Sequence, residues 1–310
     1  MILIRVEEAL TRALSALVRP LPSYINRVYE LADREGNGFV VKFYRPGRWS
    51  EAALADEHRF MHDCAAVDIP LALPLTLADG STLGECNGIS FAVFEKKSGR
   101  QFDIESDSSW QRVGSLLGRL HNAGSAGSAP ARLICHPQHS TATMLQEIAE
   151  SMESHQWRSG YTDAAQRIID TITPLFDTHE RVRIHGDFHA GNILERPGEG
   201  LMVIDFDDMA NGPEAQDFWL VLPDHYPACA AQLEQLLVGY RQFREPDPRC
   251  GLLIEPLRTM RMIYFTAWCA MQKEDYRFRQ LYPDWGSDSF WAREVSDLRG
   301  QFARITETLR

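Results

Sequence analysis

The sequence has no long apolar run and no clustered cysteines, and these absences exclude several classes of protein. No stretch is apolar over the roughly 20 residues that a helix needs to cross a bilayer, so we expect no membrane-spanning helix. The six cysteines are scattered, without a C-x-x-C pair or a histidine at zinc-finger spacing, which favours reduced structural thiols. Glu7 and Glu8 interrupt the N-terminal apolar segment, so it does not predict a signal peptide. We therefore expect a cytoplasmic protein.

Positive charge is also scarce. The chain has 32 Lys and Arg residues against 43 Asp and Glu, a formal net charge of −11. Such an acidic chain repels nucleic acid and anionic lipid, so we expect neither a nucleic-acid nor a membrane partner, which still leaves room for a local basic pocket for a phosphate. Hydrophobic residues make up 44% of the 310, enough for the core of one large domain or of two lobes.

The first part of the chain predicts a small antiparallel sheet with helices. The apolar spacing and turn residues indicate, in order, a helix around Val6–Leu17, strands over Arg27–Ala32 and Phe39–Tyr44, a helix over Ser50–Cys64, and strands over Leu71–Leu77 and Ile89–Phe94. The first two strands form a hairpin. Lys42 is then a cation in a strand, and Glu57 lies on or beside the buried stripe of the following helix.

The rest of the chain predicts mainly helices. The segment Glu95–Gly99 is the best candidate for a linker, so we place an N-terminal lobe at residues 1–95 and a C-terminal lobe at 96–310. Helical spacing begins at Trp110 and recurs over Ala164–Phe176 and in the C-terminal third. Short strands are expected at Arg181–Ile184 and in a second hairpin, Ile193–Leu194 with Leu201–Ile204.

The segment IHGDFHAGNILERPGEGLMVIDFDD carries the clearest chemistry. A hairpin brings its two ends together, so Asn192, before one strand, lies close to Asp205, after the other. Asp187 sits in the loop that leads into the same hairpin. Three oxygen-bearing side chains therefore converge, and hard oxygen ligands suit Mg²⁺, which shares its remaining positions with substrate phosphates. The sequence predicts a magnesium and nucleotide site.

Distinct roles follow for these residues in phosphoryl transfer, which needs mainly positioning and electrostatic stabilisation. Asn192 and Asp205 bridge the metal to the phosphates of ATP. Asp187 accepts or orients the proton of an incoming hydroxyl. Lys42 pairs with the α- and β-phosphates, and Glu57 holds Lys42 in place. We thus expect Asp187 and Asp205 to be catalytic.

The string from His185 to Asn192, followed by Ile204–Asp207, resembles the catalytic signature of the aminoglycoside phosphotransferase/choline kinase branch of the protein-kinase-like fold. The segments SYINRVY, VVKFYRP and IDFDDMANGPEAQDFW are more similar still to the bacterial stress-response kinase A family, which are Ser/Thr protein kinases on the aminoglycoside-kinase scaffold. The similarity runs from about Leu21 to Asp224. It implies a bilobal α+β fold, with a small antiparallel-sheet N-lobe, a mainly helical C-lobe and ATP in the cleft.

The resemblance also supports individual roles. By position, Asp187 is similar to the catalytic Asp of the family, Asn192 and Asp205 to its metal ligands, and Lys42 to its strand lysine. Glu57 is the best candidate for the helix partner of this lysine, with Asp56 and Glu51 as rivals. A further residue, Asp217, is similar to the helix aspartate that braces the backbone of the catalytic loop.

The sequence also departs from protein kinases. The hairpin entry, LPSYINR, has no glycine where kinases carry G-x-G-x-x-G, so we expect Ser23 and Asn26 to contact the phosphates instead. D-F-G and A-P-E are both absent, and the segment after Asp208 is short for an activation loop. Regulation by loop phosphorylation is therefore not expected.

Three functions fit these residues. The first is a Ser/Thr protein kinase, as the resemblance implies. The second is a small-molecule hydroxyl kinase of the aminoglycoside, choline or homoserine type, which predicts a deep acidic pocket beside Asp187. The third is a catalytically idle nucleotide-binding scaffold, suggested by the missing glycine-rich loop.

Other polar residues are expected to have structural roles. We expect His185 and His189 to brace the loop by bonding backbone. One of Asp207 and Asp208 is a candidate for a second metal and the other for a solvated or capping group. His136 and His139 lie in a polar loop and are expected at the surface.

Overall fold

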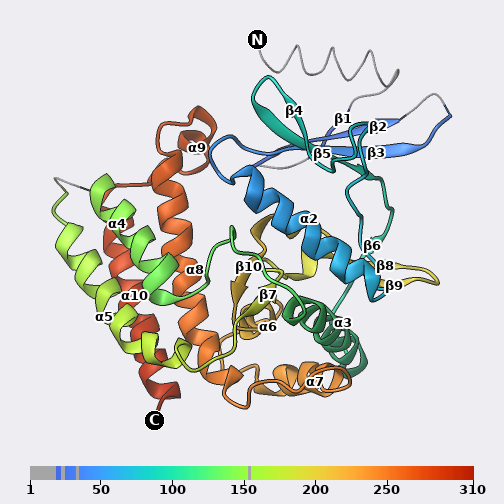
Figure 1. Cartoon of the computed structure of the whole chain (residues 1–310). Helices are drawn as coiled ribbons and strands as arrows, with labels where there is room; N and C mark the ends of the chain where they lie inside the picture. The colour runs from blue at the N-terminus through green and yellow to red at the C-terminus, as the bar shows by residue number, and fades with distance from the viewer. Residues whose placement is uncertain (1–18, 22–24, 33–34, 153–154) are drawn as a thin grey trace.

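The computed structural model describes residues 19–21, 25–32, 35–152 and 155–310. The predicted helix around Val6–Leu17 and the residue Ser23 lie outside these ranges. An antiparallel five-stranded sheet forms the N-lobe (Figure 1). Its spatial order is β1 (Arg19–Leu21), β2 (Arg27–Ala32), β3 (Gly38–Phe43), β5 (Ile89–Glu95) and β4 (Gly84–Cys86). The predicted first hairpin is confirmed, since β2 pairs with β3 from Arg27 opposite Phe43 to Ala32 opposite Gly38.

Alternation along β3 directs its side chains to the two faces of the sheet. Val41 and Phe43 pack with Tyr29 and Leu31 into one small apolar cluster. Lys42 lies on the opposite face and is buried, which turns its amine toward the C-lobe. A buried cation is tolerated in this otherwise apolar strand because carboxylates of the C-lobe lie against its amine.

Helix α2 (Glu51–Ala66) lies between the sheet and the rest of the molecule (Figure 1). It begins, as predicted, at Ser50, whose side chain accepts a hydrogen bond from the backbone N–H of Ala53 and so caps the first turn. One stripe of the helix is buried, including Leu54 against the sheet and Phe60 in the main core. The helix therefore joins the two lobes through its packing.

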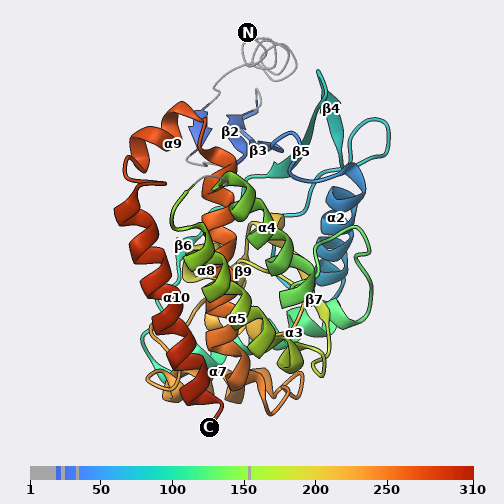
Figure 2. The same ribbon diagram turned by 90° about the vertical axis from the view of Figure 1, so that its left-hand side faces the viewer.

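Helices dominate the C-lobe (Figure 2). They are α3 (Asp107–Ser125), α4 (Ala142–Ser151), α5 (Arg158–Phe176), α6 (Ala215–Trp219), α7 (Ala230–Tyr240), α8 (Cys250–Gln272), α9 (Tyr276–Leu281) and α10 (Asp288–Thr308). A single large core joins all of these helices except α9, with Trp291, Tyr161 and Tyr240 among its fully buried side chains. The apolar residues at helical spacing in the C-terminal third pack into this core only in part. Met260, Ile263 and Ala267 belong to it, whereas Met271 is 62% exposed and Tyr264 and Trp268 line a cavity.

Short strands between the two lobes carry the loops of interest. β7 (Val182–Ile184) pairs with β10 (Ala210–Gly212), and β8 (Ile193–Arg196) forms a hairpin with β9 (Gly200–Val203), with β6 (Arg100–Gln101) beside β8. The second predicted hairpin is thus confirmed.

The predicted strand Leu71–Leu77 is wrong. The segment makes only isolated bridges, from Leu71 to Val203 and from Pro74 to Phe94. Pro70 and Pro74 lack the backbone N–H that a strand ladder needs, so the run cannot continue as a regular strand. In the described part of the chain, no helix is both long and apolar enough to span a membrane.

A buried histidine ties α2 to the sheet. The ring of His58 contacts the hydroxyl of Tyr44 at 3.0 Å and that of Thr82 at 2.7 Å. Burial, together with the charges of Lys42 and neighbouring groups, lowers the pKa of His58 from 6.5 to about 4.

We predict that this histidine makes the fold acid-sensitive. Between pH 6.5 and 4 the unfolded state binds a proton that the folded state does not, so the free energy of unfolding falls as the pH falls through this window. The full loss is roughly 3 kcal/mol. Urea titrations at stepped pH measure it. His58→Gln should flatten the profile in this window, whereas His62→Gln, an exposed residue of the same helix, should not. Equal profiles for all three proteins would contradict the assignment.

Candidate active site

The loop from His185 to Asn192 follows β7 and leads into β8. It turns at Gly186, whose φ of +82° lies in the left-handed region. A Cβ at this position would lie 2.0 Å from the carbonyl oxygen of Asp208, so no other residue fits without moving the backbone. The glycine thereby sets Asp187 at the start of the loop, next to the segment that follows β9.

A buried carboxylate braces this loop from behind. Asp217, on α6, is fully buried and accepts hydrogen bonds from the backbone N–H groups of His185 and Gly186, both at 2.8 Å. The ring of His121, on α3, lies 3.0 Å from the same carboxylate. These contacts are those expected for Asp217, and they hold the residues before Asp187 in place.

The two loop histidines also bond backbone, as predicted. The Nε2 atom of His185 lies 3.0 Å from the carbonyl oxygen of Ile204, which joins the loop to the end of β9. The Nδ1 atom of His189 accepts a hydrogen bond from the N–H of Gly191. In addition, His189 lies 3.5 Å from the carboxylate of Asp187, so it also has a part in the electrostatics of the site.

The predicted metal ligands meet at the end of the second hairpin. The backbone N–H of Ile204 donates to the carbonyl of Asn192 at 3.1 Å, so Asn192 and Asp205 are neighbours across the hairpin. The Asn192 amide N–H donates to the carbonyl of Asp187, which leaves its Oδ1 free to bind a cation.

The backbone at Asp205 presents its carboxylate outward. Its φ is +63°, in the left-handed region, and its side chain is 54% exposed. Amide and carboxylate oxygens form a donor set that fits Mg²⁺, which binds few protein ligands and completes its shell with water and phosphate. In the part of the chain that the structure describes, no three His, Cys, Asp or Glu side chains cluster as a metal cage. A set of two side-chain oxygens leaves most positions of such an ion to water or phosphate.

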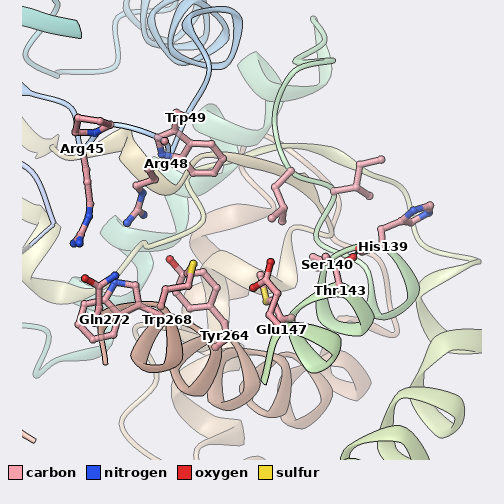
Figure 3. A pocket seen from close by; sticks show the side chains of 17 residues that line it. Arg45, Arg48, Trp49, His139, Ser140, Thr143, Glu147, Tyr264, Trp268 and Gln272 are labelled. Carbon is pink, nitrogen blue, oxygen red and sulfur yellow. Dashed lines mark hydrogen bonds between the residues drawn. The ribbon is translucent and has the colours of Figure 1, made fainter. Parts of the chain in front are cut away.

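A cavity of about 660 Å³ lies between the loop after β3 and helix α8 (Figure 3). Its walls come from the loop Arg45–Trp49, from the segment between Leu133 and Glu147, and from the C-terminal half of α8. A smaller hollow of about 80 Å³ shares Trp49 and Tyr264 with it and is also lined by Gly186 and Asp208. The smaller hollow therefore lies next to the large cavity and reaches Gly186, which precedes Asp187, and Arg261, which binds Asp187.

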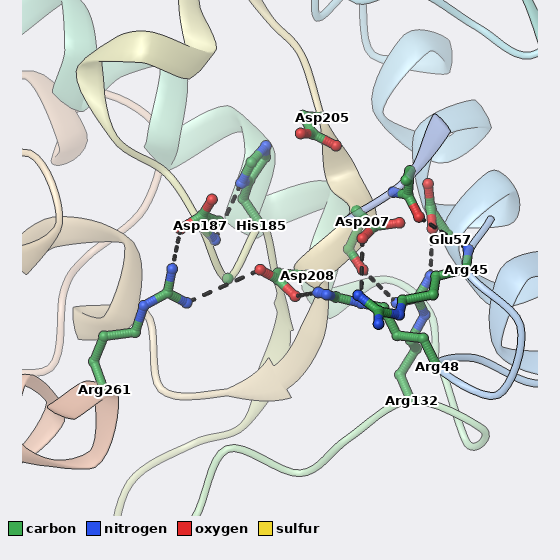
Figure 4. Close-up of polar contacts among 12 residues, drawn as sticks. Arg45, Arg48, Glu57, Arg132, His185, Asp187, Asp205, Asp207, Asp208 and Arg261 are labelled. Atoms are coloured by element: carbon green, nitrogen blue, oxygen red, sulfur yellow. Dashed lines mark hydrogen bonds and ion pairs between the residues drawn. The ribbon is translucent and has the colours of Figure 1, made fainter. Parts of the chain in front are cut away.

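A chain of opposite charges fills the site (Figure 4). The amine of Lys42 lies 3.0 Å from Asp205 and 3.1 Å from Asp207. Burial alone would lower the pKa of Lys42, but the carboxylates of Asp207, Asp205 and Glu57 outweigh it and raise the pKa well above the usual value. Lys42 is therefore charged, and it links β3 to both aspartates after β9.

The expected ion pair between Glu57 and Lys42 is not formed. Glu57 instead binds the guanidinium of Arg132, which also donates to the backbone carbonyls of Ala53 and Asp207. Arg132 lies in the connection after α3, and its guanidinium is buried together with the carboxylate of Glu57. It therefore takes the place that Lys42 was expected to have. Glu57 acts on Lys42 only through its charge.

Two further arginines were not predicted. Arg48 binds Asp208 and lies 3.4 Å from Asp207, while Arg261, on α8, binds Asp187 at 2.9 Å. Each is a lone arginine far from the motif in sequence, so no local pattern indicates its position. Burial raises the pKa of Asp187, but the hydrogen bond from His189 and the charge of Arg261 reverse this and lower it to about 2. Asp187 is therefore ionised at neutral pH.

Three other polar side chains lie in surroundings that differ from those expected, and a fourth lies at the edge of the site. Asp207 and Asp208 are both ion-paired inside the site, so neither is a solvated or capping group. His136 is buried against Asp177 rather than at the surface, because its ring accepts a hydrogen bond from the backbone N–H of Gln138 and caps a helical turn. Asn26 is buried and accepts from the backbone N–H of Arg45, at the edge of the site.

We predict that Asp217→Asn misplaces the loop. The substitution leaves one of two buried backbone N–H groups without an acceptor, which costs about 2 kcal/mol of stability. A shift of the loop by about 1 Å lowers kcat by about a hundredfold, with a smaller effect on the KM for ATP. Unfolding and steady-state phosphate transfer measure the two effects. The exposed Asp170→Asn on α5 is the control. Unchanged kcat in Asp217→Asn would contradict a positioning role.

Comparison with known proteins agrees with this geometry. Residues 17–252 match the model of the phosphotransferase enzyme family. Stress response kinase A of Escherichia coli (strain K12) is 36% identical over 311 residues, covering 98% of this chain and 90% of that protein. The serine/threonine protein kinase RdoA of Salmonella typhimurium is 35% identical over 283 residues, covering 89% of this chain and 84% of that protein.

Solved structures show the same fold at lower identity. The amicoumacin kinase hAmiN, in complex with AMP-PNP, Ca²⁺ and Ami, has a TM-score of 0.76 at 18% identity, covering 96% of this chain and 93% of that one. A microcompartment-associated aminopropanol kinase has a TM-score of 0.71 at 19% identity, with 99% and 97% covered. The bilobal kinase-like fold is thereby confirmed, and the chain belongs to the phosphotransferase enzyme family and, within it, to the stress response kinase A family.

Proposed function

We propose that the chain transfers the γ-phosphate of Mg-ATP to the hydroxyl of a Ser or Thr side chain in a protein. The observation that carries this proposal is the placement of Asp187 on a braced loop, beside the oxygen-bearing side chains of Asn192 and Asp205. The protein acceptor follows from the relatives, one of which is named as a serine/threonine protein kinase.

The charge network suggests how nucleotide enters. In this structure Lys42 neutralises Asp205 and Asp207. Mg²⁺, held by Asn192 and Asp205, would neutralise charge on the phosphates. Lys42 would then turn its amine to the α- and β-phosphates, which replace the carboxylates as its partners. Asn26 and Ser23 remain candidates for phosphate contacts at the start of the sheet.

Asp187 would orient the acceptor. Its low pKa makes it a weak base, and phosphoryl transfer by a loose transition state needs little basicity from it. The acceptor hydroxyl would donate a hydrogen bond to Asp187 and point its oxygen at the γ-phosphate. Arg261, which binds Asp187 here, would then lie near the transferred group and would stabilise its negative charge.

A second candidate is a small-molecule hydroxyl kinase. A volume of about 660 Å³ is within the range of roughly 300–1,000 Å³ that is typical of small-ligand sites. However, the lining includes Arg45, Arg48 and a single carboxylate, Glu147. The deep acidic pocket that a polycationic antibiotic requires is therefore not what lines this cavity.

Transfer of labelled γ-phosphate from Mg-ATP separates these functions. The acceptors are the protein itself, a generic basic protein and a panel of small alcohols. Label on Ser or Thr that is absent with Asp187→Asn supports the protein kinase. Label on a small alcohol alone moves the chain to the second candidate. No transfer to any acceptor, with nucleotide still bound, would favour the idle scaffold.

We predict different defects for the two aspartates. Asp187→Asn should lower kcat by about 10²–10⁴-fold and leave the binding of Mg-ATP nearly unchanged, because it removes the group that orients the hydroxyl. Asp205→Asn should abolish the magnesium-dependent part of nucleotide binding, and a chelator should do the same to the wild type. Calorimetry and initial rates measure both effects.

The exposed Asp163→Asn on α5 serves as the control for the loss of one carboxylate. If Asp187→Asn and Asp205→Asn weaken nucleotide binding to the same extent, the separate roles given to them are wrong.

A further inference from the structure

The large cavity has polar atoms without partners in its walls. Gln272, at the end of α8, is only 5% exposed, and its side-chain Oε1 has no hydrogen-bond partner among the residues that the structure describes. The same holds for the indole Nε1 of Trp49, on the opposite wall. A buried polar atom without a partner costs free energy, so each of these atoms favours a ligand that completes it. The Oε1 atom of Gln272 requires a hydrogen-bond donor, and the Nε1–H group of Trp49 requires a hydrogen-bond acceptor.

Two opposite charges face the same space without a hydrogen bond or ion pair of their own, and Arg45 acts on the exposed Asp275 only through its charge. The guanidinium of Arg45 forms no hydrogen bond or ion pair with any described residue, and its side chain points toward Gln272 (Figure 3). Glu147, from α4, projects into the space below Arg48 and Trp49 and has no described ion-pair partner either. Burial and the neighbouring Glu150 raise the pKa of Glu147, in keeping with a carboxylate that lacks a cation.

The other charges around the cavity are already neutralised. Arg48 binds Asp208 and lies near Asp207, and Arg261 binds Asp187. His139 lies at the exposed rim beside Glu147. The charges available to an incoming molecule are thus a cation at the Arg45 end and an anion at the Glu147 end.

We propose that the cavity selects a bipolar acceptor. Such an acceptor places an anionic group at Arg45 and a cationic group at Glu147, while an amide-like group satisfies Gln272 and Trp49. Its hydroxyl would enter the smaller hollow, which Gly186 and Arg261 line next to Asp187. Trp49, Tyr264 and Trp268 provide apolar walls for the part between the charges. The inference rests on the proposed phosphotransferase function and names the chemistry of its acceptor.

Two sources share this chemistry. One is a protein segment in which Ser or Thr stands between an acidic and a basic side chain. The other is a small alcohol that carries both an ammonium and a carboxylate group, such as L-homoserine. A polycation fits poorly, because Arg45 repels it and Glu147 is the single carboxylate in the wall of the large cavity.

The test uses five Ser-containing peptides. Two are bipolar, with Arg before and Asp after the Ser or the reverse, and the other three have two Arg, two Asp or two Gln as flanking residues. L-homoserine, ethanolamine and glycolate form the small-molecule arm. Phosphate transfer is measured with the wild type and with Glu147→Gln, Glu147→Lys, Arg45→Gln and Arg45→Glu. The controls are Asp163→Asn, an exposed residue of α5, and Arg19→Gln, in the same lobe as Arg45.

We expect the wild type to prefer one order of the bipolar peptide, or L-homoserine, over the singly charged acceptors. Each neutralising substitution should raise the KM for the bipolar acceptor by about tenfold, with a smaller effect on the KM for ATP. Glu147→Lys should shift the preference to the peptide with two Asp, and Arg45→Glu to the peptide with two Arg. If only the peptides change their KM in the variants, the acceptor is a protein segment. If only L-homoserine does, the acceptor is a small alcohol. Charge preferences that are the same in the wild type and in all four variants would overturn the proposal.

Binding provides a readout that does not depend on turnover. Trp49 and Trp268 line the cavity, so the bipolar peptide or L-homoserine should change the tryptophan fluorescence, and Trp49→Phe should reduce this change. If no acceptor is phosphorylated, the proposed function fails. The bipolar site then still stands if Glu147→Lys and Arg45→Glu abolish the fluorescence change, and it fails if they do not.

Discussion

The site depends on one buried carboxylate. Asp217 is fully buried, yet it accepts two backbone N–H bonds from the start of the catalytic loop and contacts the ring of His121. A buried charge is tolerated only where such partners satisfy it, so the loop and the carboxylate stabilise each other. The loop then needs no regular structure of its own, because α3 and α6 hold it through this contact.

The second constraint is the balance of charge in front of the loop. Four aspartates crowd into this site, and Lys42, Arg48 and Arg261 each neutralise at least one of them. Lys42 lies on β3 of the N-lobe sheet, Arg48 in the loop between β3 and α2, and Arg261 on α8. The network therefore joins both lobes across the cleft, and the arrival of nucleotide and metal would redistribute its partners rather than assemble a new site.

Much of this arrangement could be predicted from the sequence. The alternation of residues predicts the β2–β3 hairpin, and Ser50 predicts the start of α2. The ordered string around Asp187 predicts the loop and the hairpin that bring Asn192 beside Asp205. These features depend on residues close together in sequence. The misassigned strand at Leu71–Leu77 shows the limit, since apolar spacing suggested a ladder that its prolines cannot form.

The remaining features depend on tertiary packing. Arg48, Arg132 and Arg261 are single arginines in a loop, a connection and a long helix, and nothing in their local sequence indicates a carboxylate partner. The partner of Glu57 was mispredicted for the same reason, because Arg132 reaches it from 75 residues away along the chain. The charges of the cavity likewise come from separate elements, so only the fold brings Arg45 and Glu147 to one space.

The most direct measurement of the central claim is a crystal structure of the chain with Mg²⁺ and a non-hydrolysable ATP analogue. We expect Mg²⁺ at about 2.1 Å from the side-chain oxygens of Asn192 and Asp205. The amine of Lys42 should contact the phosphate oxygens, and the carboxylate of Asp187 should face the γ-phosphate. A nucleotide bound elsewhere, or metal held without Asn192 and Asp205, would contradict it.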